Sequence, residues 1–217
     1  MPVLVFVALA GLVLVGFLSR QNNQTHNGYQ VDTDTELPDQ TPTFFEAATV
    51  NIDLASLITP SVAPDVAVNN EKAFLDMLAY SEGTSGPNGY RTFFGGSLFE
   101  SYADHPRRFF DFTDKAGRRL KTSAAGRYQF LSRTWDELKT KLDLPDFGPE
   151  SQDAAALELI RQRGATNDVR AGRVSTAVKK CAPTWASLPG AGYSQPERKL
   201  DSLLTAYTNA GGLNEVA

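Results

Sequence analysis

The stretch that decides the fold is FLDMLAYSEGT, residues 74–84. Its apolar side chains recur at a spacing of three and four residues, which predicts a helix over about 70–82 with one buried face. The side chains on that face are Phe74, Leu75, Leu78 and Ala79. Gly83 is a typical residue just beyond a helix end. The predicted helix therefore ends on an acidic residue, Glu82.

The position of Glu82 favours a raised pKa of its side-chain carboxyl group. The negative end of the helix dipole disfavours a charged carboxylate there, and aromatic neighbours would add desolvation. Cleavage of a glycosidic bond needs a carboxylic acid that is still protonated near neutral pH. On position alone, however, a solvated glutamate at a helix end is the plainer interpretation.

The rest of residues 69–217 predicts a mostly helical domain of α+β class. Further apolar stripes predict helices over about 127–142, 151–163, 168–181 and 196–210. Residues 90–113 are instead rich in aromatic side chains, with turn signals at 95–96 and 114–117. We expect a small antiparallel β element there, giving two lobes. Trp135, Trp185 and the single cysteine, Cys181, are expected in the core.

Four sequence blocks in this order resemble the lambda-type phage lysozymes over roughly residues 72–212. The first block surrounds Glu82, and the others lie at 98–107, 125–136 and 185–193. They read FLDMLAYSEGT, then LF-Y-DHPR, then AGRYQ-LSR-WD, then WASLPGAGY. The resemblance implies a lysozyme-like fold and a catalytic role for Glu82.

The resemblance also implies a reaction. Members of this family are lytic transglycosylases, which cleave the β-1,4 bond between N-acetylmuramic acid and N-acetylglucosamine without water. The muramoyl 6-hydroxyl attacks its own anomeric carbon, and one carboxyl group serves as acid and then as base. No metal or cofactor is required. The expected partner is the peptidoglycan glycan strand, and the expected role is phage-type lysis of the host cell by a monomer.

Three alternatives remain open at this point. A hydrolysing lysozyme of the same fold would use a second carboxylate, for which the candidates are Glu100, Asp104 and Asp136. A virion-associated enzyme could act during delivery of the phage genome. A wall-binding module without catalysis is less consistent with Glu82 beside Gly83.

Candidate sugar-binding residues follow from the same blocks. The resemblance suggests that Tyr128 and Gln129 face the sugar groove, where a tyrosine ring stacks on sugars and an amide pairs with an N-acetyl group. Tyr193, after the glycine-rich stretch 189–192, resembles the lower lip of the family's groove. Tyr80 and Ser81, directly before Glu82, complete the set.

Residues 1–68 lie outside the resemblance. Residues 3–18 are an uninterrupted run of apolar residues and glycines, about 24 Å long as a helix and marginal for a membrane span. We expect residues 1–19 to be an inner-membrane anchor, of a kind that could later be released. Residues 20–68 read as an acidic, polar linker. The folded domain would then lie in the periplasm.

Composition excludes other classes of function. Residues 70–217 hold 20 Lys and Arg against 18 acidic residues, too weak a basic excess for a nucleic-acid-binding protein. The chain has one cysteine and two histidines. A disulfide within the chain is therefore impossible, and a histidine-rich metal site is excluded.

Overall fold

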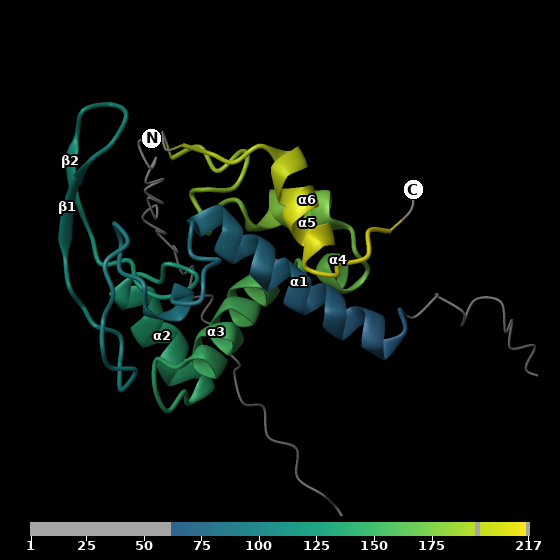
Figure 1. Cartoon of the computed structure of the whole chain (residues 1–217), viewed down its shortest axis with the longest axis horizontal. Coiled ribbons are helices and arrows are strands. Elements are labelled where there is room, and N and C mark those ends of the chain that lie inside the picture. The colour runs from purple at the N-terminus through teal and green to yellow at the C-terminus, as the bar shows by residue number, and fades with distance from the viewer. Residues whose placement is uncertain (1–61, 194–195, 216–217) are drawn as a thin grey trace, which may run out of the picture. The chain divides into compact units, whose positions relative to one another are not determined.

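The structure is a computed structural model that describes residues 62–193 and 196–215. Over these residues the chain forms six α-helices, one short 3₁₀ helix and a two-stranded antiparallel sheet (Figure 1). The elements are α1 (Pro64–Glu82), η2 (Gly89–Arg91), β1 (Phe110–Thr113), β2 (Arg119–Thr122), α2 (Ser132–Leu142), α3 (Pro149–Gln162), α4 (Thr166–Arg170), α5 (Val174–Cys181) and α6 (Leu200–Asn209).

Helix α1 is the central element of the described domain. It crosses the view in Figure 1 and packs against α3, α4 and α6. Its predicted apolar face is fully packed, since Phe74, Leu78 and Ala79 are 0% exposed and Leu75 is 6% exposed. The helix begins at Pro64, earlier than predicted, because proline is well suited to the first helical turn. Its end at Glu82 agrees with the prediction.

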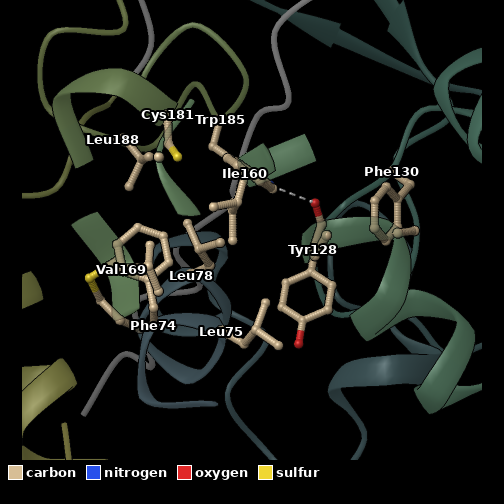
Figure 2. Close-up of a cluster of buried hydrophobic side chains, with 14 of the residues drawn as sticks. Phe74, Leu75, Leu78, Tyr128, Phe130, Ile160, Val169, Cys181, Trp185 and Leu188 are labelled. Carbon is tan, nitrogen blue, oxygen red and sulfur yellow. Dashed lines mark hydrogen bonds between the residues drawn. The ribbon is translucent and has the colours of Figure 1, made fainter. Parts of the chain in front are cut away.

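The core continues from α1 into the C-terminal half of the domain. Figure 2 shows Leu78 together with Tyr128, Ile160, Cys181 and Trp185 from other parts of the chain. The indole N–H of Trp185 donates a hydrogen bond of 3.2 Å to the backbone carbonyl of Tyr128. Cys181 is 0% exposed, and burial raises the pKa of its thiol to about 12, so it is a core residue as predicted.

The two-stranded sheet is a hairpin that extends away from the helices (Figure 1). Phe110 pairs with Thr122 and Thr113 with Arg119, and the turn lies at 114–117, where the sequence predicts one. Below the hairpin, aromatic rings join the β element to the helices in edge-to-face and tilted contacts. These rings are Phe93, Phe99, Phe110, Phe130, Trp135 and Phe147.

Three helix boundaries differ from the prediction for local reasons. Residues 126–129 are a turn closed by the β-bridge between Ala125 and Phe130, and α2 starts only at Ser132. The predicted helix 168–181 is broken at Gly172, which has φ 75°, into α4 and α5. Residues 196–199 are not helical, because the backbone N–H of Arg198 bonds to the carbonyl of Ser187 rather than within a helix.

The predicted fold class needs one correction. It included a transmembrane helix, but none of the helices within residues 62–193 and 196–215 has the length and apolar character to cross a membrane. Even the 19-residue α1 carries charged side chains such as Glu71, Lys72 and Asp76. The segment predicted to span the membrane, 1–19, lies outside the described residues, as does most of the predicted linker. The described residues therefore do not bear out the transmembrane helix of the predicted fold class or the inner-membrane anchor of the predicted localisation.

A pH dependence of stability follows from His105, which is buried beside Phe147. Its Nε2 lies 2.9 Å from the Phe130 carbonyl, and its Nδ1 accepts a hydrogen bond of 3.0 Å from the Arg107 N–H. Both bonds form only when the ring is neutral with its proton on Nε2. Burial lowers the pKa of His105, so the unfolded chain binds the proton more readily. Stability is therefore complete above the unfolded pKa of about 6.5 and falls as the pH drops below it, by at most about 1.4 kcal/mol per pH unit.

The measurement is urea unfolding at pH 5 to 8 for chains with and without His105→Gln. Both chains should carry Glu82→Gln, because burial raises the pKa of Glu82 and its titration would act in the opposite direction. We expect the chain with His105 to lose stability toward pH 5 and the His105→Gln chain to lose less. Parallel curves would contradict the assigned tautomer.

Candidate active site

The site is centred on Glu82, the last residue of α1. Its side chain is buried, with 3% of the residue exposed. Directly after it, Gly83 adopts a left-handed conformation with φ 75°, which glycine reaches without strain. The next two backbone N–H groups turn back to the Tyr80 and Ala79 carbonyls at 3.2 and 2.8 Å. This tight ending fixes the direction in which the chain leaves the glutamate.

The two carboxyl oxygens of Glu82 have different surroundings. The hydroxyl of Ser187 donates a hydrogen bond of 2.6 Å to Oε1. Oε2 is buried and has no hydrogen-bond partner among the residues that the structure describes. An unpaired buried oxygen is costly in a folded protein. Oε2 is therefore the oxygen of this carboxyl group whose hydrogen-bonding capacity is unused among the described residues.

Burial also sets the protonation of the carboxyl group. Burial raises the pKa of Glu82 from 4.5 to about 7, while the Ser187 hydrogen bond and the charge of Arg198 act in the opposite direction. The direction agrees with the sequence prediction, and the cause is burial, which the sequence analysis expected beside the helix dipole. A carboxyl group with this pKa holds its proton in a good fraction of molecules at neutral pH, as a general acid requires.

Arg198 holds the end of α1 from the other side. Its guanidinium donates to the backbone carbonyls of Tyr80 and Ser81, both at 3.3 Å. It also lies over the Tyr80 ring, 5.0 Å from the centroid. A cation at these terminal carbonyls is favoured by the helix dipole. Tyr80 is thus partly covered by Arg198, beside the acid.

The block at 125–130 is joined to α1 through Thr84. The Thr84 hydroxyl contacts the carbonyls of Ala79 and Arg127 at 3.1 and 2.5 Å. The side chain of Arg127 forms an ion pair with Asp76 of α1 at 2.5 Å. Two of the sequence blocks therefore meet at the helix that carries Glu82.

Tyr128 and Gln129 are buried, and their polar atoms contact the protein. The Tyr128 hydroxyl donates to Asp153 of α3 at 2.6 Å, and the residue is 2% exposed. The Gln129 amide donates to the carbonyls of Thr92 and Gly126 at 3.2 and 2.9 Å. Gln129 has φ 50°, an uncommon conformation for a residue other than glycine. These contacts give both residues a structural role, and their predicted sugar contacts stay predictions.

Ser81 and Tyr193 are the other two predicted sugar-binding residues. Ser81 is buried, donates to the Leu78 carbonyl at 2.8 Å and lies 3.0 Å from the Ser187 hydroxyl. Tyr193 is half-buried and donates to the Pro183 carbonyl at 2.7 Å. The glycine-rich loop before it is held by Glu197, whose carboxylate accepts the N–H groups of Gly190 and Gly192 at 2.9 and 3.1 Å.

The candidate second carboxylates are placed differently from Glu82. Glu100 is exposed. Asp104 accepts from Lys139 and from the Trp135 indole, both at 3.2 Å, and pairs with Arg107 at 2.7 Å. Although burial acts to raise it, hydrogen bonds lower the pKa of Asp104 to about 2. Asp136 also pairs with Arg107. Asp104 and Asp136 are thus ion-paired with neighbouring basic side chains.

The described residues offer no candidate metal site, and a pocket that lies elsewhere in the chain does not include Glu82. Residues 62–193 and 196–215 contain no group of three or more His, Cys, Asp or Glu that could hold a metal ion. A pocket of about 450 Å³ lies between α1, α3 and α4, and its lining is mainly apolar. Its charged residues include the ion-paired Glu71 and Arg170. Glu82 does not line this pocket.

Sequence reasoning missed two residues of the site, Ser187 and Arg198. Ser187 lies in the block at 185–193, where a polar residue between the apolar Ala186 and Leu188 was the available signal. Arg198 lies outside the four blocks, in a segment predicted as helix. Both contact the end of α1 across more than 100 residues of chain.

Comparison with known proteins places the chain in a family. A family model described as Endolysin matches residues 72–214. The endolysin of Escherichia phage lambda is 49% identical over 154 residues, covering 68% of this chain and 95% of that protein. The endolysin of Escherichia phage P2 is 45% identical over 155 residues, covering 66% and 94%. A structure of bacteriophage lambda lysozyme complexed with a chitohexasaccharide superposes with a TM-score of 0.63 at 47% identity, covering 68% of this chain and 97% of that one. This chain therefore belongs to the endolysin family, the lambda-type phage lysozymes that degrade peptidoglycan.

Proposed function

We propose that this chain is a lytic transglycosylase that cleaves the β-1,4 bond between N-acetylmuramic acid and N-acetylglucosamine during phage-type lysis of the host. The observation that carries the proposal is Glu82, a buried carboxyl group with a pKa raised to about 7 and an oxygen, Oε2, without a partner among the described residues. Family membership supplies the substrate class, because endolysins act on peptidoglycan.

The proposed reaction uses Glu82 twice. The protonated Oε2 donates its proton to the glycosidic oxygen as the bond to the muramoyl anomeric carbon breaks. The 6-hydroxyl of the same muramoyl residue then attacks that carbon, and the Glu82 carboxylate accepts the hydroxyl proton. The product is a 1,6-anhydro sugar, no water is consumed, and Glu82 ends protonated as it began. A pKa near the working pH suits a group that serves as both acid and base.

The surroundings of the other carboxylates support a reaction with one carboxyl group. A hydrolysing lysozyme uses a second carboxylate facing the same bond. Of the three candidates, Asp104 and Asp136 are ion-paired with Arg107, and Glu100 is exposed, unlike the buried Glu82. Hydrolysis is the alternative outcome that the product analysis below tests.

Glycan binding is part of the same proposal. The related lambda lysozyme was solved with a chitohexasaccharide, and we propose that this chain binds a glycan strand beside Glu82. Tyr80 presents a partly exposed ring beside the acid, and aromatic faces stack on sugar rings. Tyr193 presents a half-buried ring next to a glycine-rich loop. Ser81, Tyr128 and Gln129 are buried. A sugar could contact them only through an atom that is not already hydrogen-bonded within the protein.

The decisive experiment is mass spectrometry of the muropeptides that the chain releases from purified sacculi. We expect N-acetylmuramic acid at the new chain ends to be the 1,6-anhydro form, which is lighter than the reducing form by one water. Borohydride reduction provides the control, because it adds hydrogen to reducing ends and leaves anhydro ends unchanged. Products with reducing muramic acid ends would establish a hydrolase instead.

A further inference from the structure

The two carboxyl oxygens of Glu82 differ in their hydrogen bonding, and this difference indicates a role for Ser187. Oε1 accepts the hydroxyl of Ser187 at 2.6 Å, whereas Oε2 has no partner among the described residues. We propose that Ser187 is a positioning residue that keeps the reactive proton of Glu82 on Oε2, the oxygen without a hydrogen-bond partner among the described residues. The inference rests on the proposed role of Glu82 and adds to it a residue that decides which oxygen acts.

The protons of the neighbouring hydroxyl groups permit two arrangements. Ser81 lies 3.0 Å from Ser187 and is itself 2.8 Å from the Leu78 carbonyl. In the first arrangement Ser187 donates to Oε1, and the carboxyl proton is on Oε2. In the second, Oε1 carries the proton and donates to Ser187, which then turns to donate to Ser81. The second arrangement places the acid proton on Oε1, the oxygen that faces the serines, and leaves Oε2 without a proton.

The first arrangement is favoured because it persists through the reaction cycle. When Oε2 loses its proton, the hydrogen bond from Ser187 to Oε1 becomes charge-assisted and therefore stronger. No hydroxyl has to rotate between the acid step and the base step. A preorganised donor of this kind avoids reorganisation while charge develops. The second arrangement requires Ser187 to reverse its hydrogen bond each time Glu82 ionises.

The turn that carries Ser187 is fixed on both sides. The Trp185 indole donates to the Tyr128 carbonyl at 3.2 Å, and the Arg198 N–H donates to the Ser187 carbonyl at 2.8 Å. The side chain of the same Arg198 bonds the terminal carbonyls of α1. Helix end and serine are therefore held together by one residue. Ser187 itself is 4% exposed, so its expected effect on the glycan passes through Glu82.

Ser187→Ala tests the proposal. Because the hydrogen bond from Ser187 lowers the pKa of Glu82, its removal should raise that pKa further. We expect kcat to fall about 10- to 100-fold, as loss of one hydrogen bond to a charged group predicts, with KM nearly unchanged. The alkaline limb of the pH profile should move to higher pH. Ser187→Thr keeps the hydroxyl and should restore both the profile and most of kcat.

The direct readout is the titration of the Glu82 carboxyl carbon, followed by ¹³C NMR in the full chain. The matched control is Ser123→Ala, a buried serine whose hydroxyl bonds to Ser132 instead. It should leave the Glu82 titration unchanged. If Ser187→Ala does not fold, Ser187→Cys provides a group of similar size that donates weakly. An unshifted titration in a folded Ser187→Ala or Ser187→Cys chain would overturn the proposal, as would a threonine variant that behaves like alanine.

This titration is separate from the test of the proposed function. The titration reports on the Ser187–Glu82 bond whatever product the enzyme forms. Reducing-end products from sacculi would remove the transglycosylase assignment and leave the positioning role in place. A shifted titration with kcat and its pH profile at wild-type values would reject the role of Ser187 in the reaction.

Discussion

Glu82→Gln should reduce the release of soluble muropeptides from purified sacculi by about 100- to 10,000-fold, the range in which general acid–base groups contribute. Glutamine has nearly the same shape, and its amide oxygen can still accept the hydroxyl of Ser187. It has no proton to give to the leaving oxygen and no carboxylate to accept the proton of the 6-hydroxyl. Both halves of the proposed reaction are therefore lost in one variant, while the packing at the end of α1 is kept.

The control for this variant is Glu137→Gln. Glu137 is an exposed residue of α2 whose carboxylate pairs with Arg133, and surface ion pairs of this kind contribute little to stability. It should lyse sacculi at the normal rate. Thermal unfolding of both variants separates loss of chemistry from loss of fold, and removal of the buried acid is expected to leave Glu82→Gln at least as stable at pH 8. Full lytic activity in Glu82→Gln would show that the acid is another residue.

The sequence was sufficient to predict those features of the fold that depend on residues close together in the chain. The apolar stripe predicts the buried face of α1, and Gly83 predicts its end, because helix periodicity and a left-handed terminal residue are local properties. The direction of the Glu82 pKa shift was also expected, but its cause is burial, which depends on the folded chain. The core location of Cys181 and Trp185 also follows from their apolar neighbours.

The sequence was insufficient where distant segments decide the conformation. The bridge between Ala125 and Phe130 prevents the helix predicted from 127, because backbone pairing there replaces the first helical turn. Ser187 reaches Glu82 across 105 positions, and no periodicity in either segment encodes that contact. The same holds for Arg198, whose backbone pairing with Ser187 keeps it out of α6. The difference between the two oxygens of Glu82 is therefore a property of the folded chain.

Trp135→Ala should lower the free energy of unfolding by about 3–5 kcal/mol, the usual cost of removing a large buried aromatic side chain. Trp135 is 0% exposed, and its ring lies 4.5 Å from that of Phe147 in an edge-to-face contact. Its indole N–H also donates to Asp104 at 3.2 Å. Removal leaves a cavity between α2 and the aromatic cluster and takes one donor from a carboxylate that holds Lys139 and Arg107. The loss is a large part of the 5–15 kcal/mol typical of a folded domain.

Urea unfolding of the variant at constant pH measures this loss of stability. Two further variants serve as comparisons. Trp135→Phe keeps most of the ring but removes the hydrogen bond, so it should lose less than the alanine variant. Leu98→Ala removes an apolar side chain that is 46% exposed and should change stability by less than about 1 kcal/mol, because little apolar area leaves the core. At a temperature where Trp135→Ala stays folded, its lytic rate per folded molecule should remain close to normal, in contrast to that of Ser187→Ala. The reason is that the cavity lies in the aromatic cluster, so Glu82 keeps its own contacts. An alanine variant as stable as the wild type would show that the aromatic cluster does not hold α2 in place.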